Sequence, residues 1–98
     1  MITEFARLNV KAGREQAFEA AFAQAKQIIS QQAGFISLRL YRHCEQTGVY
    51  QLEVYWQDIA SHKDGFRQSA DYQQWKALLH HFYDPFPSVE YFQPIISA

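Results

Sequence analysis

The feature that most constrains the fold of this 98-residue chain is a long segment with a single apolar stripe. Strand-like segments flank it on both sides. Between Arg14 and Gln32 the apolar side chains recur every three or four residues, the spacing of one side of an amphipathic helix. The flanking segments, Ile2–Val10 and Phe35–His43, are rich in β-forming residues and are predicted to be strands. Gly34, between the helix and the second strand, supplies the left-handed residue that helix ends favour. The stripe consists of Phe18, Ala21, Phe22, Ala25, Ile28 and Ile29.

The middle of the chain predicts a hairpin. Cys44–Gly48 has the composition of a loop, and Val49–Gln57 is a third strand-like segment that we expect to pair antiparallel with the second. Alternation along the second strand predicts two faces with different neighbours. One face carries Phe35, Ser37, Arg39 and Tyr41, and the other carries Ile36, Leu38 and Leu40.

The last third of the chain predicts a pair of helices and a final strand. Asp58 can cap a short helix that runs to about Arg67, and Ser69 can cap a second helix. The prolines in Asp84–Pro87 cannot continue that helix. Val89–Ile96 then returns to a strand-like pattern, with its proline best placed at an edge.

This order predicts an α+β chain with the ferredoxin-like βαββαβ plan, as a single domain over residues 1–98. In that plan a four-stranded antiparallel sheet has its helices on one face. The open face is mixed, with aromatic and polar side chains side by side, so we predict that it meets a second copy in a face-to-face homodimer. The residues expected on that face are Phe35, Arg39, Tyr41, Val49, Gln51, Glu53 and Tyr55.

Charge and cysteine content exclude several classes of protein. The net charge is −1 and the pI is about 6.4, and no basic block is present, which argues against nucleic acid or an anionic membrane as partner. One cysteine, Cys44, cannot form a disulfide framework and fits a reducing compartment. No apolar run approaches a membrane span and no leader is apparent, so the sequence predicts a cytoplasmic location.

Metal and nucleotide sites are not predicted. The glycines are isolated, so no phosphate-binding loop can form from them, and no zinc spacing occurs among the histidines. A hydrolase triad is also disfavoured, because Ser61 and His62 are helical neighbours that do not face each other. The four histidines are His43, His62, His80 and His81.

The aromatic content, 16% of the chain, is the most unusual feature of the composition. The inward faces of the second and third strands and the two helix stripes must pack against one another, and His62 and Phe66 lie four residues apart on the same side of their helix. A pocket lined in this way suits a flat apolar ligand, with Trp56, His62 and Tyr72 as its hydrogen-bonding groups. The alternative is that these aromatic residues form only a core.

Several short segments, in this order, resemble a known family. They are Lys11-Ala12-Gly13 before a long helix, Ala33-Gly34-Phe35 entering a strand, Val54-Tyr55-Trp56 ending one, and Ser69-x-x-Tyr72-x-x-Trp75. Over nearly its whole length the chain resembles the antibiotic biosynthesis monooxygenase (ABM) family of dimeric α/β barrels. The resemblance implies a homodimer joined through the sheets and a pocket between sheet and helices. Members of the family oxidise phenols and hydroquinones with O2 and without metal or flavin; others degrade haem or process small signalling molecules.

The family's site residues are only partly present. The tryptophan that ends the third strand in polyketide-oxidising members is Trp56, and His62 stands where those members have a tyrosine. Leu52 replaces an asparagine of the same strand, which removes one polar contact. Phe66 stands where many members place a histidine.

Haem degradation is disfavoured by the same comparison. It requires an asparagine, a tryptophan and a histidine ligand at positions that here hold Phe5, Phe66 and Trp75.

Two functions are therefore predicted as alternatives. The first is a cofactor-independent monooxygenase, with neither metal nor cofactor, that oxidises a small phenol or hydroquinone with O2. In it His62 acts as base, and Trp56 and Tyr72 act as donors. The second is a non-catalytic ligand-binding or stress-related dimeric α/β barrel, and an inward-pointing His62 would favour the enzyme. The predicted substrate-binding residues are Phe5, Phe22, Leu40, Leu52, Phe66 and Trp75.

Overall fold

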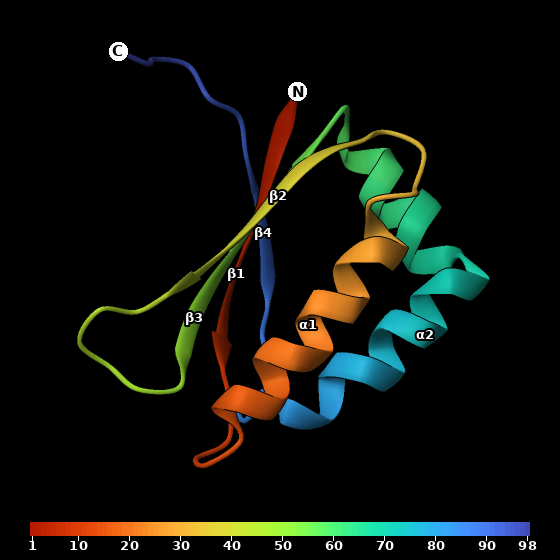
Figure 1. Ribbon diagram of the computed structural model, residues 1–98. Coiled ribbons are helices and arrows are strands. Elements are labelled where there is room, and N and C mark those ends of the chain that lie inside the picture. The colour runs from red at the N-terminus through yellow and green to blue at the C-terminus, as the bar shows by residue number, and fades with distance from the viewer.

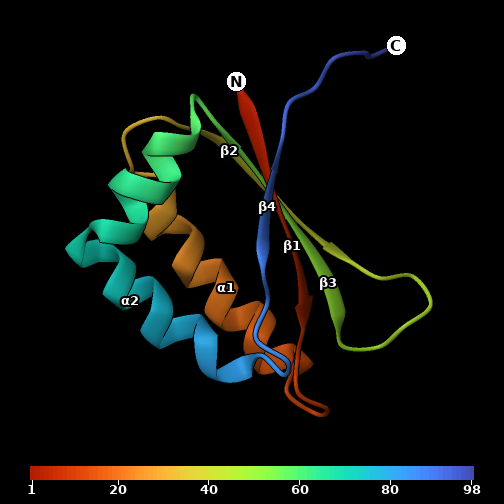
Figure 2. The same ribbon diagram turned by 180° about the vertical axis from the view of Figure 1, so that it is seen from behind.

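The computed structural model describes residues 1–98 and forms a four-stranded antiparallel sheet with two helices on one face (Figure 1). The view from behind shows both helices on the same side of the sheet and none on the other side (Figure 2). This arrangement confirms the ferredoxin-like βαββαβ plan. Its elements are β1 Ile2–Asn9, α1 Glu15–Ile29, β2 Phe35–Arg42, β3 Val49–Trp56, α2 Ala70–Leu79 and β4 Val89–Phe92, and the strand order is β2-β3-β1-β4.

The first strand, β1, lies in the middle of the sheet and pairs with the last strand, β4. It pairs along its whole length with β3 and on its other edge with β4, so that Glu4 has Val54 on one side and Tyr91 on the other. Because side chains alternate across a strand, Glu4 shares the helix-facing side with Ala6 and Leu8. An acidic residue is thereby placed among core residues.

The core lies between the sheet and the helices and is rich in aromatic rings. Phe18 on α1 is fully buried, and its ring centroid lies 5.7 Å from Phe22, 4.9 Å from Tyr50 and 5.7 Å from Phe82. The predicted apolar stripe therefore does cover the sheet, and burial of these side chains stabilises the contact of α1 with it. No helix is both long and apolar enough to cross a membrane.

A β-bulge near the start of β2 places Phe35 and Ile36 on the opposite faces of the sheet from those predicted. Phe35 pairs with Trp56 and Ser37 with Tyr55, so Ile36 is the extra residue in β2. Phe35 consequently points inward, with its ring edge on Trp56 at 5.8 Å, whereas Ile36 is 50% exposed. The prediction that Phe35 lies on the open face and Ile36 on the inner one was wrong, because the inserted residue shifts the alternation.

The segment between β3 and α2 is capped as predicted but has a different helical form. Asp58 Oδ1 accepts hydrogen bonds from the backbone N–H and the hydroxyl of Ser61, at 2.8 and 2.7 Å. A five-residue π-helical turn begins at Ser61, and the 3₁₀ turn Phe66–Gln68 follows it. Ser69 Oγ then accepts from the backbone N–H of Tyr72 at 3.2 Å and caps α2.

The last strand is shorter than predicted. It ends at Phe92 rather than Ile96, and Pro94, which has no backbone N–H to donate, lies just beyond. Ile95 and Ile96 are 86% and 88% exposed.

Gly34 is required for two reasons, which gives a first prediction. Its φ is +84°, and a Cβ added there would overlap the Ser61 side chain. Gly34→Ala is therefore expected to lower the free energy of unfolding by more than the about 1–2 kcal/mol that a left-handed conformation costs. Urea denaturation measures the loss. Gly13→Ala is the matched control, because its φ is +81° but no atom lies within 4 Å of the added Cβ. Equal losses would show that Ser61 moves aside without cost.

Candidate active site

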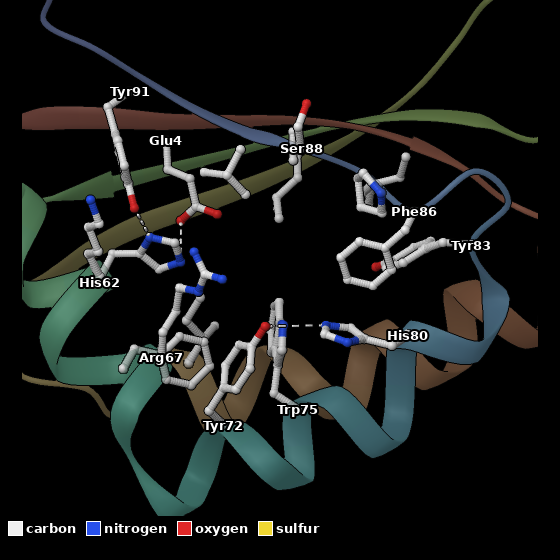
Figure 3. A pocket seen from close by; sticks show the side chains of 18 residues that line it. Glu4, His62, Arg67, Tyr72, Trp75, His80, Tyr83, Phe86, Ser88 and Tyr91 are labelled. Carbon is white, nitrogen blue, oxygen red and sulfur yellow. Dashed lines mark hydrogen bonds and ion pairs between the residues drawn. The ribbon is translucent and has the colours of Figure 1, made fainter.

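A cavity of about 380 Å³ lies between the sheet and the second half of the chain (Figure 3). Eleven of its eighteen lining residues are hydrophobic. Its volume is at the lower end of the roughly 300–1,000 Å³ typical of small-molecule sites, so it suits a ligand of one or two rings. The polar side chains gather in two groups, one around Glu4 and His62 and the other around Tyr72 and His80.

Glu4 is the buried acid of the cavity. Only 4% of the residue is exposed, and its Oε1 accepts a hydrogen bond from Trp56 Nε1 at 2.8 Å. The other carboxylate oxygen has no hydrogen-bond partner in the chain and points into the cavity. Burial raises the pKa of Glu4 to about 7, although the Trp56 hydrogen bond and the positive charge of Arg67 act in the opposite direction. The carboxyl is thus about half ionised at neutral pH.

His62 connects Glu4 to the last strand. The π-helical turn directs its ring inward, where Nδ1 lies 2.6 Å from the Tyr91 hydroxyl and Nε2 lies 3.4 Å from Glu4 Oε1. Its ring also packs on Trp56, with centroids 5.4 Å apart. Burial, together with the positive charge of Arg67, lowers the pKa of His62 to about 4. The imidazole is therefore neutral at pH 7.

These contacts define the proton positions when Glu4 is ionised. A neutral His62 that accepts the Tyr91 O–H at Nδ1 carries its proton on Nε2, which lies 3.4 Å from Glu4 Oε1. Both ring nitrogens are then engaged within the protein. Glu4, through its free oxygen, is the member of the group that can receive a proton from a ligand.

The second polar group lies across the cavity. The Tyr72 hydroxyl is 3.5 Å from His80 Nε2, and burial, with the nearby Lys76 and Arg67 charges, lowers the pKa of His80. The ring of Phe66 makes edge-to-face contact with Tyr72 at 5.3 Å. The Tyr72 hydroxyl is therefore a hydrogen-bond donor that lies close to the ring of Phe66.

Comparison with known proteins identifies the family. The model of a family described as antibiotic biosynthesis monooxygenase matches residues 1–78. YczJ of Bacillus subtilis, an uncharacterized protein, is 50% identical over 95 residues, which are 97% of this chain and 100% of YczJ. The chain belongs to the antibiotic biosynthesis monooxygenase family. The resemblance found in the sequence is thereby confirmed.

Solved structures of the family share the fold. A protein from Bordetella bronchiseptica assigned as an antibiotic biosynthesis monooxygenase has a TM-score of 0.93 and 36% identity, with 97% of each chain covered. SnoaB, a cofactor-independent oxygenase from Streptomyces nogalater, has a TM-score of 0.85 over 98% of this chain and 94% of its own. Its identity is 19%, so that likeness shows the fold alone.

The structure brings together some of the site residues expected for this family and not others. The cavity is lined by His62, Tyr72, Leu52, Phe66 and Trp75. Trp56 does not line it; the side chain is fully buried behind Glu4 and its N–H is bonded to that carboxyl.

Three predicted binding residues lie elsewhere. Phe5 is on the open face of the sheet, where its ring makes edge-to-face contact with Phe92 at 5.5 Å. Phe22 and Leu40 line a separate depression beside the ion pair of Glu19 and Arg42. No three His, Cys, Asp or Glu side chains lie close enough together to hold a metal ion.

Four polar residues that line the cavity were not predicted from the sequence to be site residues. They are Glu4, Arg67, His80 and Tyr91. A signal existed for Glu4, because it occupies an inward position of a strand whose neighbours at that spacing are apolar. An acid on a core face is costly unless it is paired or neutral, and such positions are candidates for function.

Proposed function

We propose that this protein is a cofactor-independent monooxygenase that oxidises a small phenol or hydroquinone with O2 in the Glu4–His62 cavity. The observation that carries the proposal is the free oxygen of Glu4, which faces a largely apolar cavity and belongs to a carboxyl with a pKa of about 7. A general base works best when its pKa is near the working pH. Membership of the family supports the same reaction class.

The proposed reaction needs little from the protein beyond binding and proton transfer. Glu4 takes the proton of a phenol hydroxyl, and the electron-rich phenolate passes one electron to O2. The phenoxyl radical and superoxide combine to form a carbon–oxygen bond, and Glu4 returns its proton to the resulting peroxide anion. The hydroperoxide then loses water to leave a quinone. Phenol plus O2 gives quinone plus water: the ring loses four electrons, one oxygen atom enters it, and the other leaves in water.

The surrounding side chains have separate roles in this proposal. His62 and Trp56 hold the Glu4 carboxyl, His62 through the 3.4 Å contact and Trp56 through the 2.8 Å hydrogen bond. Tyr72 supplies the donor for negative charge that develops on the ring oxygen. Phe66 and Trp75, with ring centroids 5.6 Å apart, bind the flat ring.

Oxygen uptake by the purified, chelator-treated protein tests this function. Hydroquinones and phenols of one to three rings are offered, and autoxidation without protein is subtracted. We expect uptake that saturates with substrate, at one O2 per quinone, with one atom of ¹⁸O₂ found in the product. The absence of uptake over the whole panel, with quenching of tryptophan fluorescence by the same compounds, would favour the ligand-binding alternative.

A homodimer through the open face of the sheet is part of the same proposal. That face exposes Tyr41 and Phe92, which are 43% and 52% accessible, without a helix to cover them. Sedimentation equilibrium should give twice the 11.5 kDa mass of one chain. The mass of a single chain at micromolar concentration would contradict the dimer.

A further inference from the structure

Arg67 brings a permanent positive charge into the cavity. It lies in the 3₁₀ turn Phe66–Gln68, and its guanidinium points inward beside His62 and Glu4 (Figure 3). Its charge lowers the pKa of both neighbours, as expected for a cation close to them. Arg67 is exposed and forms no ion pair within the chain. Its guanidinium therefore lies at the border between solvent and a cavity with a mostly hydrophobic lining.

The charge balance of the lining is positive. Lys63 and Arg67 are its two permanent cations, and Glu4 is its only acidic residue. Because burial raises the pKa of Glu4, this carboxyl is mainly protonated just below neutral pH. His62, with a pKa of about 4, is neutral there, and burial lowers the pKa of His80 and disfavours its charged form. The cavity therefore presents two permanent cations and a single carboxyl that is only partly ionised.

This charge lies at one end of the cavity. Arg67 is next to Glu4, whereas Phe86 and Tyr83 provide aromatic surface at the other end (Figure 3). A ligand that complements both ends of the cavity has a flat apolar ring, which packs on the aromatic end. It also has an anionic group beside its own hydroxyl, so that Arg67 contacts the anion and Glu4 contacts the hydroxyl. The planar guanidinium fork matches a carboxylate with two parallel hydrogen bonds.

We infer that the substrate is an aromatic acid whose carboxylate is adjacent to the reacting hydroxyl, and that Arg67 selects it. That this aromatic acid is oxidised rests on the proposed function. That Arg67 binds its carboxylate does not, because binding can be measured without the reaction. An anion at this place would accept hydrogen bonds from Arg67 beside a mostly apolar lining, and hydrogen bonds to charged groups contribute more than neutral ones.

Calorimetric titration without oxygen tests the inference. The two probes are 2,5-dihydroxybenzoate and the neutral 2,5-dihydroxybenzamide, which has nearly the same shape. Just below neutral pH we expect the benzoate to bind more tightly to the wild-type protein. Arg67→Gln should weaken benzoate binding roughly tenfold or more, the effect of losing hydrogen bonds to a charged group, and weaken benzamide binding much less, because only a neutral carbonyl is lost as partner. Arg67→Lys, which keeps the charge but not the fork, should recover part of the loss.

Lys26→Gln is the matched control, because it removes one positive charge from the exposed side of α1. It should leave both affinities unchanged. Equal losses for the two probes in Arg67→Gln, or equal affinities in the wild-type protein, would overturn the inference. Selective binding of the benzoate without oxygen uptake would instead count against the proposed monooxygenase reaction and leave the role of Arg67 standing.

Discussion

Glu4→Gln is expected to lower kcat for the oxidation of a phenol or hydroquinone by about 10²- to 10⁴-fold, the usual contribution of a positioned base. Glutamine keeps the shape of the side chain and an oxygen that can accept the Trp56 N–H, but it cannot take a proton. The fold should therefore survive while proton removal is lost. Oxygen uptake at saturating substrate, after subtraction of autoxidation, measures the effect.

The pH dependence separates a lost base from a disturbed cavity. In the wild-type protein kcat/KM should rise with pH through about 7, because the base must be ionised and the pKa of Glu4 lies there. This rise should be absent from the residual activity of Glu4→Gln. Glu45→Gln, an exposed acid of the β2–β3 loop, is the control and should behave as the wild-type protein does. Full activity in Glu4→Gln together with its loss in His62→Gln would return the role of base to His62.

The same two residues should have opposite effects on the pH dependence of stability. Glu4 has a folded pKa of about 7 against 4.5, so the stability it contributes is present below pH 4.5 and is lost as pH rises through 7. His62 has a folded pKa of about 4 against 6.5, so its contribution is present above pH 6.5 and is lost as pH falls through 4. In the wild-type protein the two contributions nearly cancel between pH 4.5 and 6.5.

Single substitutions should reveal each contribution. Glu4→Gln leaves His62, so its free energy of unfolding should rise with pH over this window relative to the wild-type protein. His62→Gln leaves Glu4, and its free energy of unfolding should fall. Each difference should approach about 3 kcal/mol, since one pKa unit corresponds to about 1.4 kcal/mol. Urea denaturation at several pH values measures both, with Glu45→Gln as control. Parallel curves for the two variants would show that burial does not shift these pKa values.

The fold could be predicted from the sequence because its signals are local. The helical stripe from Phe18 to Ile29 and the caps at Asp58 and Ser69 depend on residues a few positions apart. The bulge at Ile36 could not be predicted in this way. It is determined by how β2 pairs with β3, and one extra residue reverses the faces of its neighbours.

The candidate site could be predicted only in part for a similar reason. His62 and Tyr72 lie on segments whose inward sides follow from spacing, and both line the cavity. The contact of His62 with Tyr91 and Glu4 depends on the pairing of the first strand with the last, which no local pattern specifies. The raised pKa of Glu4 depends on burial, and burial is a property of the assembled layers.

The environment of Glu4 depends on the pairing of the short edge strand β4 with β1. Only four residues pair β4 with β1, and Tyr91 among them stands beside Glu4. Local opening of such an edge needs less free energy than global unfolding. When β4 detaches, water reaches the Glu4 carboxyl, its proton affinity returns to that of an ordinary acid, and the base near neutrality is lost. In the proposed reaction the role of Glu4 as base thus depends on the pairing of one strand, and the pKa of a single carboxyl indicates whether that strand is paired.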